Sequence, residues 1–218
     1  MFNRAPAGDR IAYMNTEGDR RSVVVAELDG ANATPLVSET DAEKYLDLRD
    51  WSPDGSKLLI QHGELGAVCG VDCRAFGTVV HEVIDLTGAP IWQLDASERV
   101  TGVTWAGADR LLISQPAVNV DEGPVEADVR LLELPTGEET SLLGPIGEEC
   151  CLSVSPDGML AISLKVSPSS GDPRCVVVEV RTGRELVATN QPDNGPASCD
   201  MVSWTADGSL VLSSFSGI

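Results

Sequence analysis

The feature of the sequence that most constrains its fold is a short phrase that returns along the chain. It reads WSPDG at 51–55, WAGAD at 105–109, VSPDG at 154–158 and WTADG at 204–208, so the copies start 54, 49 and 50 residues apart. A more degenerate copy, RAPAGD, begins at Arg4. Repeats of this length that consist of strand patterns are typical of β-propellers and other repeat arrays.

The segments between the phrases also share one internal order. Each phrase is followed by a short apolar run, a polar loop, a β-branched strand that ends at a glycine turn, a third strand, and a fourth strand that leads into the next phrase. No segment of helical length has a convincing 3.6-residue period, so we expect four short antiparallel strands per repeat, as in a propeller blade. A single blade cannot bury both of its faces, and blades must therefore stack on one another.

We therefore predict an all-β fold: a β-propeller of four-stranded antiparallel blades, with four full repeats plus a partial one, as an incomplete or open propeller. The chain opens on an apolar strand at 11–14, with no strand of the fourth type expected before it. An open set of blades would leave bare strand edges, which favours self-association of the isolated chain. Residues 1–218 are predicted to form one propeller, with repeat units at approximately 4–50, 51–104, 105–153, 154–203 and, in part, 204–218.

The residue types inside the phrase suit a tight turn. Proline presets φ, aspartate can hydrogen-bond the backbone ahead of it, and glycine accepts a left-handed conformation. A tryptophan is the first residue of three of the copies, where a large ring could fill the wedge between neighbouring blades. The predicted turn residues are Pro53, Asp54, Gly55, Pro156, Asp157, Gly158, Asp207 and Gly208, and the predicted wedge residues are Trp51, Trp105 and Trp204.

The charge of the chain limits the partners that it can bind. It has 34 acidic and 15 basic residues, a net charge of −19, and such a field repels the phosphate backbone of nucleic acids. No apolar run approaches the roughly 18 residues of a spanning helix, so we expect no membrane insertion by this segment. The first residues, MFNRAPAGDRIAYMN, lack the apolar core of a signal peptide, so any export signal would lie on other sequence.

These repeats resemble the WD-like propeller repeats of TolB and of the N-terminal domains of dipeptidyl-peptidase-IV-type serine peptidases. The resemblance rests on runs such as WSPDGSKLLI and VIDLTG and covers essentially the whole chain; it is good at 51–61, 154–163 and 204–214 and poorer at 105–114 and 4–14. It implies a binding scaffold but no particular ligand, because one fold hosts many functions. Because such propellers are mostly extracytoplasmic in bacteria, it also implies a periplasmic, cell-surface or secreted location rather than a cytoplasmic one.

Two of the six cysteines fall in a segment that reads as a long loop between strands, residues 62–78. A disulfide between Cys69 and Cys73 would pin that loop. Together with His62 and His81 the same cysteines offer zinc ligands, although their C-x₃-C spacing is looser than the usual knuckle. Unpaired thiols are the third interpretation.

The other four cysteines gather in the last third of the chain. Cys175 and Cys199 both begin predicted strands, which makes them a candidate disulfide pair. Cys150 and Cys151 are adjacent on a predicted strand, so their side chains would point to opposite faces. The alternative is that these cysteines are small buried apolar residues.

No catalytic set is evident in the sequence. His62 and His81 are the only histidines, and the chain contains no G-x-S-x-G elbow for a nucleophilic serine. We therefore predict a non-catalytic scaffold that binds an unknown protein or small ligand through the loops at 62–78, 115–128 and 165–174, with no cofactor. The alternative is the accessory propeller of a larger prolyl-oligopeptidase-type peptidase whose catalytic domain lies on other sequence.

Overall fold

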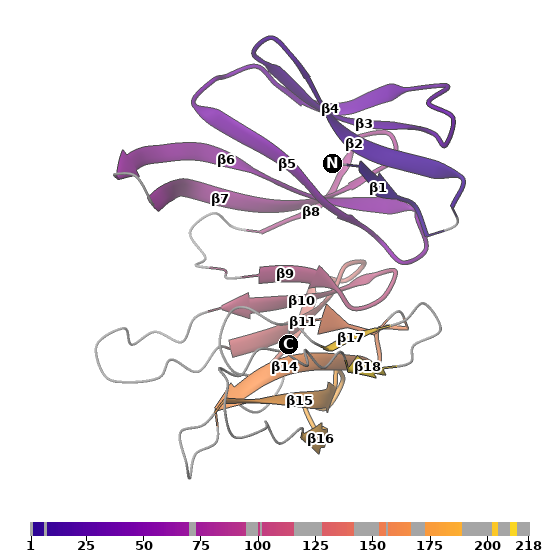
Figure 1. Cartoon of the computed structure of the whole chain (residues 1–218), viewed down its shortest axis with the longest axis vertical. Coiled ribbons are helices and arrows are strands. Elements are labelled where there is room, and N and C mark those ends of the chain that lie inside the picture. The colour runs from indigo at the N-terminus through magenta and orange to yellow at the C-terminus, as the bar shows by residue number, and fades with distance from the viewer. Residues whose placement is uncertain are drawn as a thin grey trace, which may run out of the picture. The chain divides into compact units, whose positions relative to one another are not determined.

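Figure 1 shows the chain as a computed structural model, in which all regular elements among the described residues are β-strands. The structure describes residues 2–6, 8–69, 73–94, 100, 102–115, 128–141, 153–155, 157–166, 173–188, 202–204 and 210–212. Consecutive strands pair antiparallel, so neighbours in the chain are neighbours in each sheet. The chain divides into two units, Met1–Glu98 and Arg99–Ile218.

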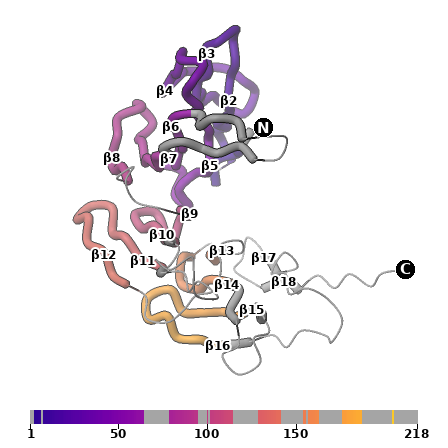
Figure 2. The backbone as a smooth tube through the Cα atoms, turned by 90° about the vertical axis from the view of Figure 1, so that its left-hand side faces the viewer, coloured from indigo at the N-terminus to yellow at the C-terminus, as the bar shows by residue number. Residues whose placement is uncertain are grey.

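The first unit contains two four-stranded sheets, each with its strands in chain order. Figure 2 follows β2, β3 and β4, which turn back on one another as consecutive hairpins. The first sheet consists of β1 (Phe2–Arg4), β2 (Arg10–Glu17), β3 (Arg20–Glu27) and β4 (Thr34–Glu39). The second consists of β5 (Lys44–Trp51), β6 (Lys57–Cys69), β7 (Cys73–Asp85) and β8 (Pro90–Gln93).

The second unit repeats this arrangement twice and adds a two-stranded sheet. Its first sheet consists of β9 (Gly102–Trp105), β10 (Arg110–Gln115), β11 (Asp128–Glu133) and β12 (Glu138–Ser141). The next consists of β13 (Ser153–Val154), β14 (Leu160–Val166), β15 (Pro173–Glu179) and β16 (Glu185–Ala188), and the last of β17 (Val202–Trp204) and β18 (Leu210–Leu212). The prediction of an all-β fold with four-stranded antiparallel blades, four complete and one partial, is confirmed.

The recurrent phrase lies inside each sheet, as the turn between its first two strands. In the second sheet β5 ends at Trp51, β6 begins at Lys57, and the two strands pair antiparallel. Each sheet therefore begins one strand earlier than the repeat unit drawn at the phrase. The same holds at the N-terminus, where β1 pairs with β2 although no strand was expected there. Its three residues, Phe-Asn-Arg, are too few and too polar to give a strand pattern.

The segment at 62–78, predicted as a loop, is largely strand. Strand β6 continues to Cys69 and β7 begins at Cys73, and the two remain paired along this length with two register shifts. Glycine-rich sequence reads as loop because glycine weakens a strand, yet cross-strand pairing overrides that weak preference here. The other two predicted loops fall mainly on residues outside the described part of the chain.

In the first unit the two sheets pack face to face through side chains that alternate along the strands. Ala12, Val23 and Val25 of the first sheet belong to one buried cluster with Leu58 and Ile60 of the second. The clustered side chains of β2 and β3 all lie on one face, because successive residues of a strand point to opposite sides. The opposite face of the first sheet is therefore free to carry a different chemistry.

The turn phrase also contributes to packing between neighbouring sheets. A Cβ built on Gly55 would lie 3.6 Å from Pro6 Cδ, which belongs to the equivalent turn of the preceding sheet. At Gly158 the approach is closer, since a Cβ there would overlap the backbone carbonyl of Ala106. Both glycines have φ near +70°. The left-handed backbone therefore favours glycine at both positions, whereas the close approach of the preceding turn requires it only at Gly158, because 3.6 Å at Gly55 is an ordinary contact.

Candidate functional site

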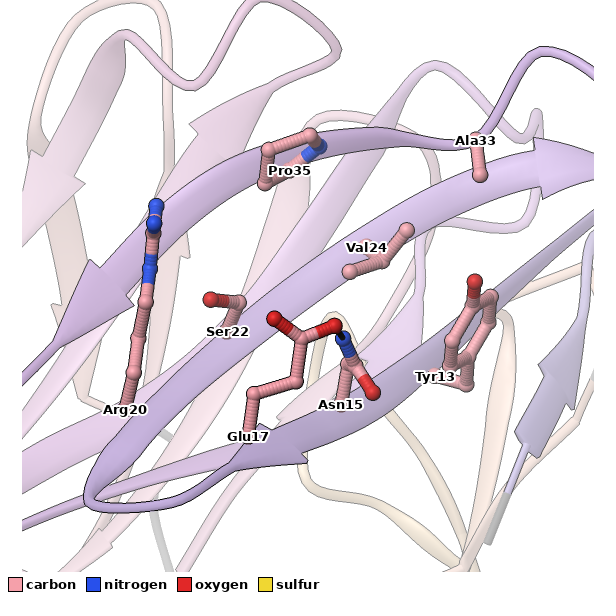
Figure 3. A pocket seen from close by; sticks show the side chains of 8 residues that line it. All are labelled: Tyr13, Asn15, Glu17, Arg20, Ser22, Val24, Ala33 and Pro35. Carbon is pink, nitrogen blue, oxygen red and sulfur yellow. Dashed lines mark hydrogen bonds between the residues drawn. The ribbon is translucent and has the colours of Figure 1, made fainter.

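A polar hollow of about 330 Å³ lies on the face of the first sheet opposite the apolar cluster (Figure 3). Strands β2 and β3 supply most of its lining as three cross-strand pairs, and β4 and the residue before it supply the rest. These pairs are Tyr13 with Val24, Asn15 with Ser22 and Glu17 with Arg20, and the remaining lining residues are Ala33 and Pro35. Every second residue of each strand contributes, so the hollow follows from the ordinary alternation of a strand.

The charged part of the hollow is organised by hydrogen bonds within the sheet. Asn15 Nδ2 donates to Glu17 Oε1 over 3.1 Å, and Arg20 Nη2 donates to Ser38 Oγ over 3.1 Å. Ser38 Oγ lies 2.8 Å from Ser22 Oγ, and Ser22 is only 5% exposed. The guanidinium and the amide are thus oriented by neighbours before any ligand arrives, which reduces the ordering that binding requires.

The other end of the hollow is less polar. Figure 3 shows Tyr13 at the side away from Arg20, with Val24 between them and Pro35 and Ala33 along the upper rim. The arrangement presents a cation and a carboxylate close together, with an aromatic and aliphatic surface beside them. Its chemistry is that of recognition by charge-assisted hydrogen bonds and apolar contact.

This hollow was not predicted from the sequence. The run at 11–14 was taken to be an apolar strand, but Tyr13 lies on the polar face and is half-buried. A signal was present further along β2, where the polar Asn15 and Glu17 alternate with Met14. Alternation identifies a face that differs from its opposite, but it does not tell which face is hollowed.

The predicted turn residues are placed by a repeated network of hydrogen bonds. Ser52 Oγ donates to Asp54 Oδ1 over 2.6 Å and accepts the N–H of Lys57 over 2.9 Å. Ser155 has the same two contacts, to Asp157 Oδ1 over 2.6 Å and from the N–H of Leu160 over 2.9 Å. Pro53 lies in the same turn as Asp54, whereas Pro156, Asp207 and Gly208 lie outside the described residues.

The aspartates of these turns are held in their ionised form. The hydroxyl of Ser155 and the N–H of Met159 both donate to Asp157 and lower the pKa of that carboxyl. At Asp54 burial favours the neutral form, but the hydrogen bonds from Ser52 and Ser56 outweigh it and lower the pKa. These carboxylates serve the turn that carries them, so the phrase itself supplies structure.

The three predicted wedge tryptophans have different surroundings. Trp51 is 3% exposed, belongs to the cluster between the first two sheets, and donates its indole N–H to the carbonyl of Asn3 over 2.9 Å. Trp105 is buried at the end of β9. Trp204, in β17, is half-buried.

The backbone pairing places some of the predicted cysteine and histidine positions. Positions 69 and 73 are directly opposite each other in the β6–β7 pairing. His62 is opposite Val80 and His81 is opposite Gln61, so the two histidines point to opposite faces of the sheet and cannot share an ion. Cys175 lies in β15 opposite Leu164, and Cys150, Cys151 and Cys199 lie outside the described residues.

His81 is a buried titratable group of the second sheet. It is 6% exposed, and burial lowers its pKa to about 4, with a smaller effect from the positive charge of Arg49. Its Nδ1 is buried without a hydrogen-bond partner among the described residues. His62 Nε2, on the other face, lies 3.3 Å from Glu82 Oε2.

Within the described residues, no group of three or more histidine, cysteine, aspartate or glutamate side chains is arranged to hold a metal ion. No helix long and apolar enough to cross a lipid bilayer occurs in that part of the chain.

Comparison with known proteins gives similarity in structure but not in sequence family. No protein-family profile matches the chain, and no curated protein matches it. Among solved structures, TolB from Acinetobacter baumannii has a TM-score of 0.57 at 16% identity, over 95% of this chain and 46% of its own. The β-propeller domain of the Trilobed protease from Pyrococcus furiosus, described as having an open velcro topology, has a TM-score of 0.57 at 18% identity, over 84% of this chain and 56% of its own.

A third neighbour is an enzyme. Prolyl oligopeptidase B from Galerina marginata has a TM-score of 0.66 at 11% identity, over 99% of this chain and 30% of its own. The chain thus spans less than two thirds of each of these proteins. At such low identity the likeness concerns the fold, and together with the described sheets it shows a β-propeller fold of the type found in TolB and in peptidase propeller domains.

Proposed function

We propose that this chain is a non-catalytic propeller scaffold that binds a protein or a small ligand, at the cell envelope. The observation that carries the proposal is the polar hollow on the first sheet, which Arg20 and Glu17 line as a cross-strand pair. The serines and aspartates of the turn phrase, by contrast, are engaged with one another and with the backbone. The fold is compatible with this role, since propellers commonly act as platforms for binding.

The chemistry of the hollow favours a small zwitterionic ligand or the equivalent group of a partner. A carboxylate can accept from the guanidinium of Arg20 while an adjacent ammonium donates to Glu17. The aromatic and aliphatic end, with Tyr13 and Val24, would then take an apolar substituent. An α-amino acid has this combination of groups, with both charges on one carbon.

A titration followed by amide NMR tests the hollow directly. Free valine is the probe, and N-acetylvalinamide, which lacks both charges, is the matched control. We expect saturable shifts at Asn15, Ser22 and Val24 with valine, at least about tenfold weaker binding of the control, and loss of the valine response in Arg20→Gln. Equal responses to both probes, or none at millimolar concentration, would rule out a zwitterion site at this place.

A second function is favoured by the peptidase neighbours. The chain covers 30% of the length of prolyl oligopeptidase B, which fits an accessory propeller that controls access to a catalytic domain on adjoining sequence. The coding sequence that adjoins residues 1–218 separates the two proposals. A G-x-S-x-G motif followed by an aspartate and a histidine would favour the peptidase, whereas further Ser-Pro-Asp-Gly repeats would favour the scaffold.

A further inference from the structure

The hairpin of β6 and β7 extends beyond the rest of the sheet that carries it. Strands β6 and β7 have 13 residues each and run side by side (Figure 1). Strand β5 pairs with β6 only as far as Glu64, and β8 pairs with β7 only over Glu82–Ile84. The end of the hairpin, residues 65–69 and 73–78, is therefore a two-stranded ribbon with no third strand beside it among the described residues.

Such a ribbon is weak when only backbone hydrogen bonds hold it. An isolated two-stranded hairpin is marginally stable in water. This one also has register shifts on both sides of Leu65, and its sequence, ELGAVCGVDCRAFGT, contains three glycines. Each glycine increases the backbone entropy that is lost when the ribbon forms. The ribbon therefore requires a further constraint to keep a single conformation.

The register provides that constraint at the tip. The last pair of the ribbon is Cys69 with Cys73. Residues directly opposite in an antiparallel pair have Cα atoms about 4.5–5.5 Å apart, which lies within the range of about 4.4–6.8 Å that disulfides span. The backbone thus places the two positions at bonding separation without any movement of the strands.

We propose that Cys69 and Cys73 form a disulfide that closes the tip of the β6–β7 ribbon. The oxidant is a low-molecular-weight disulfide such as oxidised glutathione. The thiolate of Cys69 attacks one sulfur of the oxidant and releases one molecule of reduced glutathione; the thiolate of Cys73 then attacks the Cys69 sulfur and releases the second. Two protein thiols become one disulfide, and one oxidised glutathione becomes two reduced ones.

Cys69 and Cys73 are expected to pair with each other and not with another cysteine of the chain. Only three residues separate Cys69 from Cys73, and the pairing of β6 with β7 holds their positions together. Cys175, in β15, belongs to the other unit of the chain. The effective concentration of one tip cysteine for the other is therefore high, and it depends on the fold of the hairpin.

Peptide mapping identifies the bond, because trypsin separates the peptide that carries Cys69 and Cys73 from the peptides that carry the other cysteines. Cleavage after Lys57 and Arg74 leaves Cys69 and Cys73 together in 58–74, while Cys175 falls in 175–181 and Cys199 in 185–218. We expect peptide 58–74 of the intact chain, equilibrated with glutathione and alkylated without reduction, to be two hydrogens lighter and unalkylated. A cross-link from 58–74 to another cysteine peptide, or full alkylation of 58–74, would overturn the proposal.

The role of the fold is tested by the same equilibrium in denaturant. If the register brings the cysteines together, the equilibrium constant for oxidation should be at least about tenfold larger in the native chain than in concentrated guanidinium chloride. Equal constants would mean that the short spacing alone explains the bond. That result would overturn the assignment to the folded ribbon.

Limited proteolysis tests whether the bond stabilises the ribbon. Reductant should accelerate native-state cleavage after Arg74 at least about fivefold in the wild-type chain, because opening the tip raises the population of the unpaired ribbon. The Cys69→Ser/Cys73→Ser chain is the matched control, and it should be cut at the fast rate with or without reductant. A reductant effect in this control, or none in the wild type, would contradict a stabilising role.

Discussion

At the scale of single residues, His81 couples the stability of the first unit to pH. Burial lowers its pKa to about 4, whereas an unfolded histidine titrates near 6.5. The unfolded chain therefore binds the proton first, and stability is expected to fall as the pH drops from about 6.5 towards 4, by about 1–3 kcal/mol. Urea unfolding at about pH 7.5, 6 and 5 measures this loss.

The His81→Gln variant isolates the contribution of the imidazole. It removes the titrating group and should flatten the loss over this pH range. The turn carboxylates Asp54 and Asp157, whose pKa values are lowered, contribute stability that is lost only at lower pH, as they become protonated. An unchanged pH dependence in the variant would assign the effect to other groups.

The serine of the turn phrase offers a second residue-scale prediction. Ser52 is fully buried, and its hydroxyl joins Asp54 to the N–H of Lys57. Ser52→Ala leaves both groups without this partner and should lower the free energy of unfolding by about 1–2 kcal/mol. Ser56→Ala is the control, because its exposed hydroxyl also donates to Asp54 but its loss should cost less than about 0.5 kcal/mol. Similar losses in the two variants would refute a special role for the buried hydroxyl.

At the scale of elements, the turn glycines allow the cost of a left-handed backbone to be measured separately from the cost of a steric clash with a neighbouring turn. Gly158 and Gly137 both have φ near +70°, but only Gly158 lies against the backbone of a neighbouring turn, that of Ala106. Gly137→Ala should cost about 1 kcal/mol for the left-handed backbone alone. Gly158→Ala should cost about 3 kcal/mol or more, or prevent folding of the second unit, because the added carbon overlaps a carbonyl. Equal midpoints of thermal unfolding in the two variants would show that the turn at Gly158 does not pack against Ala106 as described.

The elements also show what could be predicted from the sequence and what could not. Gly88 and Gly183 were identifiable as turn residues because each ends a β-branched run, and the structure gives both a positive φ. The strand β1 and the ribbon at 65–78 were missed, because their residues have weak strand preference and pair through contacts made elsewhere in the sheet. The strand at which each sheet begins could not be predicted either, because the length of a repeat does not indicate which of its strands comes first in a sheet.

At the scale of the whole molecule, the repeat predicted the architecture because every blade needs a neighbour. Apolar residues on β2 and β3 have a place only if another sheet covers them, and the second sheet does so through Leu58 and Ile60. The position of the candidate site, by contrast, could not be predicted from the repeat. The hollow depends on which side chains of one face are short, such as Ser22 and Ala33, and that information does not repeat from blade to blade.

The end of this series of sheets leads to a prediction about association. The fifth sheet has two strands among the described residues. A two-stranded sheet is marginal by itself, and any strand edge without a partner is open to pairing with another chain. We expect residues 1–218 in isolation to self-associate as concentration rises, which multi-angle light scattering measures. Because the net charge of −19 opposes contact between copies, added salt should strengthen the association by screening.

The variant Val211→Pro tests whether β18 provides the edge that pairs. Proline removes a backbone donor in the middle of Leu210–Leu212 and should shift the chain towards monomer without changing the unfolding of the first unit. A matched substitution, Val211→Thr, keeps both the donor and the strand preference and should leave association unchanged. A monodisperse wild-type monomer at every salt concentration would mean that the edge is protected, and the open-edge interpretation of the chain would then be wrong.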